Sequence, residues 1–135
     1  MARSGQVYGL LGRTYLVPPQ LTGVFGSDDL IRIDPDPFAI RAGYLQTVLS
    51  NEIYGRPLVV RNASGTSIPH LDPVDVREIP IPRFEDSIDA SIAELAARAS
   101  ATLAEADQLE SKAVKRATDL VSDEAGLHAF LLEQN

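Results

Sequence analysis

Hydrophobic and polar positions follow two different patterns along the chain, and the change falls near Phe84. Before that residue, apolar positions come in short runs that glycine and proline interrupt: eight of the nine glycines and all nine prolines precede it. After it, apolar residues recur at helical spacing, and neither glycine nor proline occurs between Ser87 and Gly126. The pattern predicts a small domain at 1–84, a long helix at 85–121 and a short helical tail at 122–135.

Short elements are expected within residues 1–84. Strand-forming residues at 6–17 and a short run at 21–27 predict extended segments, and alternation at 29–34 predicts a strand. A helical period begins at about Ala39, with Gly55 as its C-terminal glycine and Pro57 opening a short second helix. The expected fold class is therefore α+β, with short twisted strands and helices.

The sequence LDPVDVREIPIP (71–82) predicts a single helical turn followed by an extended segment. Asp72 suits the N-cap position, Pro73 the first helical position, and Asp75 the positive end of the helix dipole. The alternating prolines that follow end the helix and favour an extended or edge conformation.

The long helix has the spacing of a coiled-coil seam. Positions four and three residues apart follow one another over five heptads: Ile88, Ile92, Leu95, Ala99, Thr102, Ala106, Leu109, Ala113, Arg116 and Leu120. Such a helix extends about 50 Å, too far for an 84-residue domain to cover, so a partner helix is expected. Arg116 either fixes the register against an acidic partner or marks fraying of the seam. Beyond it, 122–124 are expected to cap a last short helix.

Composition restricts the class of protein. With 44% hydrophobic and 23% charged residues, the chain fits a single globular domain, and the absence of cysteine excludes disulfides and thiolate metal sites. No apolar run is long enough to span a membrane, and no signal-peptide pattern opens the sequence, so a cytoplasmic protein is expected. Residues 1–84 contain eight arginines and eight acidic residues. Residues 85–135 contain four basic and eleven acidic ones, and thus the whole net charge of −7.

The order of these motifs resembles the DNA-specificity subunits of type I restriction–modification systems. The resemblance rests on RSGQVYGLLGR (3–13), SDDLIRI (27–33), AGYLQTVLSNEIYGRP (42–57), RNASGTSIPHLDPVDVREIPIP (61–82) and the helix that follows. It covers about residues 3–121. The most specific element is the run 64–82 that leads directly into the coiled-coil helix.

The resemblance implies a non-catalytic protein that recognises double-stranded DNA. Such subunits contain two target-recognition domains, each followed by a helix. The helices pair as an antiparallel spacer, while partner subunits methylate adenine and cut or translocate DNA. This chain has one such unit, and its domain is short at the N-terminal end. It therefore fits a C-terminal fragment, a truncated product or a half-subunit that dimerises. The expected partners are DNA, a methyltransferase (modification) subunit, a restriction subunit, and a second copy or another spacer helix.

Two loops contain the candidate DNA-binding residues. Arginines suit phosphates and guanine, while small hydroxyl and amide side chains suit phosphates and base edges. In each case an ordinary surface arginine, a helix C-cap with turn residues, or the exposed face of a sheet is the alternative. The candidates are Arg3, Gln6, Tyr8, Arg13, Arg61, Asn62, Ser64, Thr66, Ser67 and His70. The partner-helix candidates are Ile88, Ile92, Leu95, Ala99, Ala106, Leu109, Ala113 and Leu120.

Enzymatic chemistry has little basis in the sequence. His128 has no acidic or histidine partner at metal spacing, and His70 either contacts phosphate or packs near the start of a helix. Ser64 or Ser67 with His70 and Asp72 lacks a nucleophile-elbow pattern. We therefore expect no catalytic residue, cofactor or metal. The main hypothesis is a DNA-recognition subunit. The alternative is a coiled-coil protein-interaction module, or a decoy regulator of restriction that does not itself bind DNA.

Overall fold

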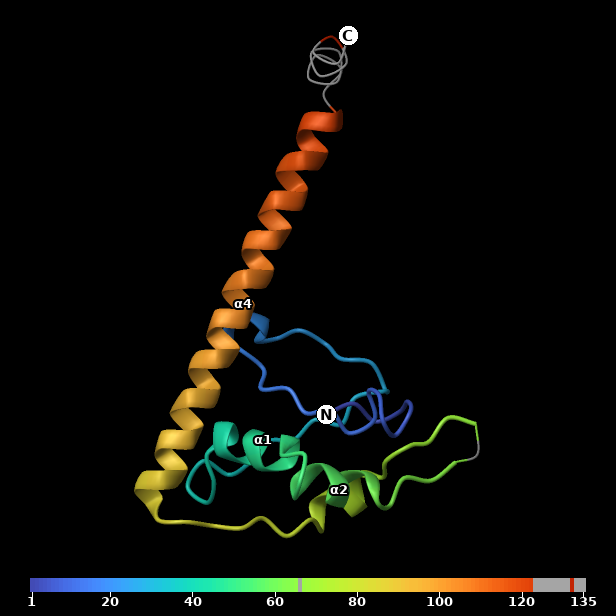
Figure 1. Cartoon of the computed structure of the whole chain (residues 1–135), viewed down its shortest axis with the longest axis vertical. Coiled ribbons are helices and arrows are strands. Elements are labelled where there is room, and N and C mark those ends of the chain that lie inside the picture. The colour runs from blue at the N-terminus through green and yellow to red at the C-terminus, as the bar shows by residue number, and fades with distance from the viewer. Residues whose placement is uncertain (66, 123–131, 133–135) are drawn as a thin grey trace. The chain divides into compact units, whose positions relative to one another are not determined.

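The computed structural model describes residues 1–65, 67–122 and 132 and divides the chain into two compact units, Met1–Ser100 and Ala101–Asn135. Its elements are the 3₁₀ helix η1 (Pro19–Leu21) and the α-helices α1 (Ala42–Ser50), α2 (Gly55–Val60), α3 (Pro73–Arg77) and α4 (Asp86–Ser122) (Figure 1). The described part is mostly helical. The predicted division at 84/85 and at 121/122 stays a prediction, and most of the predicted helical tail lies outside the described residues.

The twisted strands of the predicted α+β fold are not confirmed. Across the described ranges, strand pairing is limited to three isolated antiparallel bridges, which join Ala2 to Leu30, Ser4 to His70 and Ser64 to His70. Glycines explain part of this difference. Gly5 and Gly12 have positive φ angles of 130° and 70°, which interrupt the extended backbone on both sides of residues 6–11. The predicted strand at 6–17 therefore begins as a series of turns.

The first five residues form an extended segment, here called the central segment (residues 1–5), that joins three other parts of the first unit. The Ile31 N–H donates to the Met1 carbonyl at 2.8 Å and the Arg3 N–H donates to the Asp29 carbonyl at 2.7 Å. Ala2 exchanges hydrogen bonds with residues 12–13, and the Leu71 N–H donates to the Arg3 carbonyl at 2.9 Å. Main-chain groups that are distant in sequence thus satisfy one another without a regular sheet.

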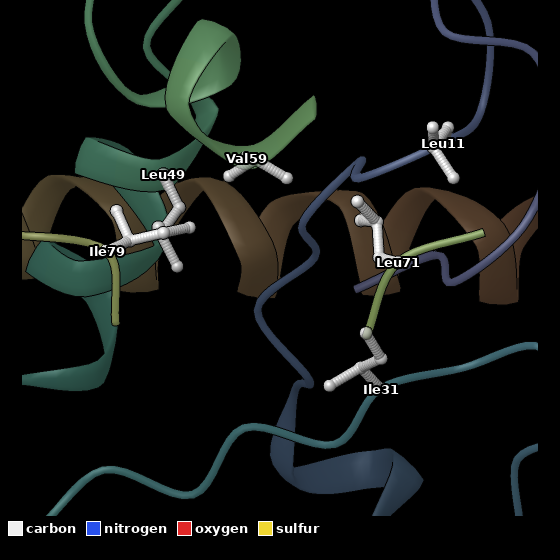
Figure 2. Packing of buried hydrophobic residues seen from close by; sticks show 6 residues of the cluster. All are labelled: Leu11, Ile31, Leu49, Val59, Leu71 and Ile79. Atoms are coloured by element: carbon white, nitrogen blue, oxygen red, sulfur yellow. The ribbon is translucent and has the colours of Figure 1, made fainter. Parts of the chain in front are cut away.

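A small apolar core lies between these segments and the helices. Its buried members are Leu11, Ile31, Leu49, Val59, Leu71 and Ile79 (Figure 2). The alternation predicted at 29–34 is visible in the burial, because Ile31 is buried while Arg32 is exposed. Ile31 and Leu71 belong to segments that hydrogen-bond to the central segment, so the core and the main-chain contacts stabilise the same arrangement.

The helix signals at Asp72 and Pro73 are confirmed. The Asp72 carboxylate accepts a hydrogen bond from the Val74 N–H at 2.8 Å, Pro73 is the first residue of α3, and Asp75 lies in its first turn. The helix has only five residues, as the prolines after it require.

The boundary between α1 and α2 differs from the prediction. Gly55 begins α2 rather than ending the helix before it, so α2 starts two residues before Pro57. A Cβ atom on Gly55 would lie 1.8 Å from the Val48 carbonyl oxygen, so the two helices approach too closely for any other residue. Between them, the Asn51 side-chain oxygen accepts hydrogen bonds from two successive N–H groups, those of Ile53 and Tyr54.

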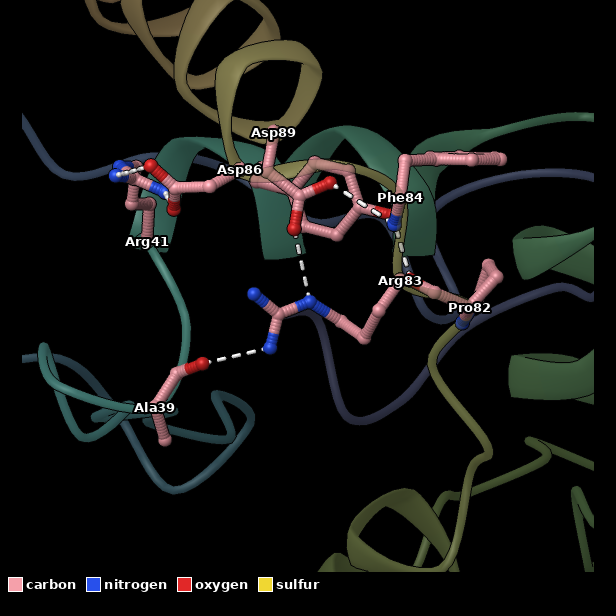
Figure 3. A network of polar contacts seen from close by, with 8 residues as sticks. Ala39, Arg41, Pro82, Arg83, Phe84, Asp86 and Asp89 are labelled. Carbon is pink, nitrogen blue, oxygen red and sulfur yellow. Dashed lines mark hydrogen bonds and ion pairs between the residues drawn. The ribbon is translucent and has the colours of Figure 1, made fainter.

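Ion pairs anchor the beginning of α4 to the rest of the first unit (Figure 3). Asp89 is only 1% exposed, and its carboxylate accepts hydrogen bonds from the Arg83 Nε–H at 2.8 Å and from the Phe84 N–H at 3.3 Å. The same Arg83 guanidinium donates to the Ala39 carbonyl at 2.6 Å. Arg41 forms a bidentate ion pair with the Asp86 carboxylate, with hydrogen bonds of 2.7 and 3.1 Å. These contacts join the start of α4 to residues 39–41 and 83–84.

The Arg41–Asp86 pair also shifts the pKa of the Asp86 carboxyl. The hydrogen bond and the charge of Arg41 lower the pKa of the Asp86 carboxyl below its ordinary value. The pair therefore contributes to stability above the pKa that Asp86 has in the unfolded chain. That contribution is lost as the pH falls through the lower pKa of the folded state.

Within the first unit, α4 also packs through small residues. A Cβ atom on Gly43 of α1 would lie 2.6 Å from the Ala93 carbonyl oxygen, so the two helices touch along their backbones. Two turns after Ala93, the Ser100 hydroxyl donates to the Leu16 carbonyl at 2.9 Å. Asp89, Ala93 and Ser100 are all buried and recur at helical spacing, which defines a domain-facing stripe of α4 (Asp89, Ala93, Ser100).

The second unit contains the rest of α4. The helix reaches Ser122, so the predicted long helix is confirmed, with 37 residues and a length of about 55 Å. An exposed ion pair between Lys115 and Asp119, one turn apart, stabilises it locally. No helix in the described ranges combines the length and apolar character needed to cross a membrane.

The buried carboxylate gives a prediction for stability. Replacing Arg83 with methionine should lower the free energy of unfolding by about 3 kcal/mol, because Asp89 would remain buried without its cationic partner. Urea denaturation followed by circular dichroism measures the change. The double variant Arg83→Met/Asp89→Leu should recover part of the loss, since no charge is then left buried.

The matched control is Arg32→Met. Arg32 forms an ion pair with Asp34 at 3.6 Å, and both of these side chains are exposed. It should change stability far less, as expected of surface ion pairs. Equal effects of Arg83→Met and Arg32→Met would contradict the anchoring role of Asp89.

Candidate nucleic-acid interface

The structure brings the two sequence-predicted loops together. Ser4 and His70 form an antiparallel bridge, and the Gly5 N–H donates to the Pro69 carbonyl at 3.2 Å. The segments 3–13 and 61–70 are therefore neighbours although residues 14–60 separate them in the sequence. We call the surface that these two segments form the two-loop surface (residues 3–13 and 61–70).

The second loop is a narrow hairpin. Ser64 and His70 exchange two main-chain hydrogen bonds of 3.0 and 2.7 Å, which close the loop at its base. Gly65 has a positive φ of 115°, and a Cβ atom there would lie 2.8 Å from the Ile68 carbonyl oxygen, so the turn requires glycine. Ser64, Ser67 and His70 are all exposed. Thr66, another predicted contact, lies outside the described residues.

Arg61 and Asn62 lie where α2 ends and this hairpin begins. Arg61 is the C-cap residue of α2, and its N–H donates to the Pro57 carbonyl at 3.1 Å. Both side chains are exposed. The helix C-cap interpretation and the DNA-contact interpretation are compatible, because the cap uses the main chain of Arg61 and leaves its guanidinium available.

The first loop is built differently from the prediction. Gln6 and Tyr8 were expected on one face of a strand, but the Gly9 N–H donates to the Gln6 carbonyl at 2.9 Å and closes a tight turn. Gln6 and Tyr8 are both exposed on this turn, and Arg13 is exposed at its end. Ser4, which precedes Gly5, lies in the extended central segment and forms a bridge with His70.

The arginines of the two-loop surface form no ion pair with a carboxylate in the described ranges. The side chains of Arg3 and Arg13 donate to the main-chain carbonyls of Asp28 and Gly9, at 3.4 and 3.1 Å. Arg61 has no side-chain partner in the described part of the chain. By contrast, carboxylates pair with three arginines elsewhere: Arg32, Arg41 and Arg83. The three sequence-predicted phosphate contacts thus lack ion-pair partners in the described ranges.

Acidic residues limit this surface on one side. Ser4 donates its hydroxyl proton to the Asp29 carboxylate at 2.6 Å, and Arg3 reaches the carbonyl of the neighbouring Asp28. The Nε of Arg3 is buried and makes no hydrogen bond to any described residue. Repulsion by Asp28 and Asp29 disfavours phosphate at this edge, so Arg13 and Arg61 are the better placed phosphate contacts.

Arg56 is a functional candidate that the sequence did not reveal. From α2, its guanidinium donates to three carbonyls of the first loop, those of Val7, Gly9 and Leu11, at 2.9, 3.1 and 2.6 Å. No local pattern announces this role, because the contacts span 45 to 49 residues. A planar guanidinium suits several carbonyls at once, which lysine does not.

The predicted partner-helix residues lie outside the domain-facing stripe of α4. Within the first unit, Ile88, Leu95 and Ala99 are exposed and Ile92 is half-buried; Leu95 is 60% exposed. In the second unit, Ala106, Leu109, Ala113 and Leu120 are exposed, and Leu109 is 59% exposed. Exposed leucines at coiled-coil spacing are what an unpaired seam presents.

Two other kinds of site, a metal centre and a groove, can be compared with the two-loop surface. The described ranges contain no group of three His, Cys, Asp or Glu residues placed to hold a metal ion. A groove lies among residues 31–35, α1, α3 and residues 79–81, and it is lined mostly by apolar side chains. It includes none of the sequence-predicted site residues.

Comparisons with known proteins return no relative. Neither protein families, nor curated proteins, nor solved structures match this chain. The case for a function therefore depends on the residues and contacts above and on the resemblance in sequence.

The exposed pair at the end of α2 gives the second prediction. Replacing Arg61 and Asn62 together with alanine should weaken binding to duplex DNA about tenfold at low salt, through a lost phosphate contact and a lost base-edge contact. The melting temperature should stay within about 2 °C, because neither side chain is buried.

Fluorescence anisotropy with a labelled duplex and thermal melting by circular dichroism provide the two readouts. Arg77→Ala is the matched control, since Arg77 is exposed on α3 outside the two-loop surface. If the double variant loses stability in proportion to its affinity, the loop has a structural role instead.

Proposed function

We propose that this chain is a DNA-recognition subunit, or a part of one, of a type I restriction–modification system. It directs a partner adenine methyltransferase subunit, and a restriction subunit, to a target sequence in double-stranded DNA. It carries out no catalysis itself and acts in the cytoplasm. The target-recognition unit comprises residues 1–84, and the long helix pairs with another spacer helix.

One observation carries this proposal: two distant loops join into one surface whose arginines have no carboxylate partners among the described residues. Arg13 and Arg61 are exposed on it, beside exposed hydroxyl, amide and imidazole groups from Ser64, Ser67, Asn62 and His70. Cations attract phosphates, and amide and hydroxyl groups read base edges in the major groove. Both kinds of contact are needed for sequence-specific recognition.

The distribution of charge also supports a DNA contact through the two-loop surface rather than through α4. Residues 1–84 are neutral in sum, and residues 85–135 hold the full net charge of −7. The phosphate backbone repels acidic surfaces, so α4 is suited to protein partners and the two-loop surface to DNA.

A second candidate function has an observation of its own. The exposed seam on α4 and the acidic charge of residues 85–135 fit a coiled-coil module that binds protein alone. Such a module acts as a decoy: it occupies the methyltransferase without delivering it to DNA. The two candidates differ in whether the chain has affinity for DNA.

Salt dependence separates the two candidates. If Arg3, Arg13 and Arg61 each neutralise one phosphate, log K should fall against log salt with a slope of about −2.7, or about 40-fold between 50 and 200 mM. Each arginine-to-alanine change should reduce the slope by about one. The measurement is a duplex titration of the full chain, alone and with the methyltransferase subunit encoded beside it.

The decoy hypothesis makes the opposite prediction. A decoy forms a stable complex with the methyltransferase subunit but shows no affinity for duplex at any salt concentration. Sequencing of the host genome for methylated adenine adds an independent readout, because a DNA-recognition subunit yields a discrete methylated motif.

The seam gives the fourth prediction. Leu95→Asp combined with Leu109→Asp should convert a dimer, or a complex with a partner helix, into monomer, because two charges would be buried in the helix interface. Light scattering measures the mass. The control places the same charges outside the seam, at Ala97 and Gln108, both of which are exposed.

Circular dichroism should show equal helix content in both double variants. An unchanged mass for Leu95→Asp/Leu109→Asp would contradict the pairing of α4 with a partner helix. The proposed DNA recognition would then depend on the two-loop surface alone.

A further inference from the structure

The turn at residues 6–9 presents an aromatic ring that the fold itself does not use. Tyr8 is 100% exposed, so its ring is not part of the packing of the described residues. The turn closes when the Gly9 N–H donates to the Gln6 carbonyl at 2.9 Å, and the Leu11 N–H reaches the same carbonyl at 3.3 Å. We call residues 6–9 the Tyr8 turn.

Arg56 holds the main chain on both sides of Tyr8. A single nitrogen, Nη2, donates to the carbonyls of Val7 at 2.9 Å and Gly9 at 3.1 Å, and Nη1 donates to Leu11 at 2.6 Å. Arg56 belongs to α2, where the neighbouring Val59 is a core residue. The turn is therefore attached to the core through Arg56 and through Val7, which packs against the core cluster, while the ring of Tyr8 remains in water.

Arg13 is connected to the same arrangement. Its Nε–H donates at 3.1 Å to the Gly9 carbonyl, which also accepts a hydrogen bond from Arg56. Two guanidinium groups thus converge on one oxygen, and neither forms an ion pair with a carboxylate in the described ranges. The result is a local concentration of positive charge beside a preformed turn with an exposed ring.

We propose, building on the DNA-binding function above, that Tyr8 enters a groove of double-stranded DNA and that Arg56 is the residue that positions it. Arg13 contacts the adjacent phosphate. The ring loses hydration when it meets base edges and sugars, which favours binding. Because Arg56 already orders the turn, little conformational entropy remains to be lost on binding.

The probe is a duplex selected from a random library by the full-length wild-type chain at 50 mM salt. Anisotropy titrations then compare the variants. Tyr8→Ala should weaken binding about tenfold, as expected for the loss of one groove contact, without lowering the melting temperature. Tyr8→Phe, which keeps the ring, should bind within about threefold of wild type. Tyr15→Ala is the control, because Tyr15 is an exposed aromatic outside the two-loop surface.

Arg56→Lys tests the positioning role, since it keeps the charge but loses the planar set of donors. It should weaken binding about fivefold, and adding Tyr8→Ala to it should then cost less than threefold, because an unpositioned ring has little left to lose. Hydrogen exchange should show faster exchange of the Gly9 and Leu11 amides in Arg56→Lys.

The outcomes separate this inference from the function on which it rests. Wild-type binding with the expected salt slope, combined with unchanged binding by Tyr8→Ala, overturns the role of Tyr8 and leaves the proposed function intact. Additive effects of Arg56→Lys and Tyr8→Ala overturn the positioning role alone. Failure of the wild-type chain to retain any duplex at 50 mM salt overturns both.

Discussion

The arrangement of the first unit depends on the hydrogen bonds of the central segment. Its peptide groups bond to residues 12–13, 29–31 and 69–71, so five residues determine which loops become neighbours. A regular sheet would distribute this function over many residues. Here the few bonds that replace a sheet also bring Ser4 next to His70, and the two-loop surface exists because of them.

Elements with local signals could be predicted from the sequence. Asp72 and Pro73 define the start of α3, and the run without glycine or proline from residue 83 to residue 125 contains the whole of α4 (Asp86–Ser122). The strands could not be predicted correctly, because Gly5 and Gly12 adopt positive φ angles that no apolar pattern reveals. Strand-forming residues there turn instead of extending.

The candidate site was predictable as two loops but not as one surface. The bond from Gly5 to Pro69 and the bonds from Arg56 to residues 7–11 join positions far apart in the chain, and no spacing rule reports such contacts. The burial of Asp89 could not be predicted from the sequence for a related reason. An aspartate near the start of an acidic helix suggests a solvated face, and only the packing of α4 on α1 makes it a buried anion.

The way α4 is attached has a consequence for dissecting the protein. A cut after residue 84, where the composition changes, would remove the partners of Arg41 and Arg83 and expose the backbone of α1 at Gly43. The hydroxyl of Ser100 still donates a hydrogen bond to the Leu16 carbonyl, in the segment before α1. A fragment that keeps these contacts must therefore extend at least through Ser100, and the first four turns of the helix belong, in physical terms, to the domain.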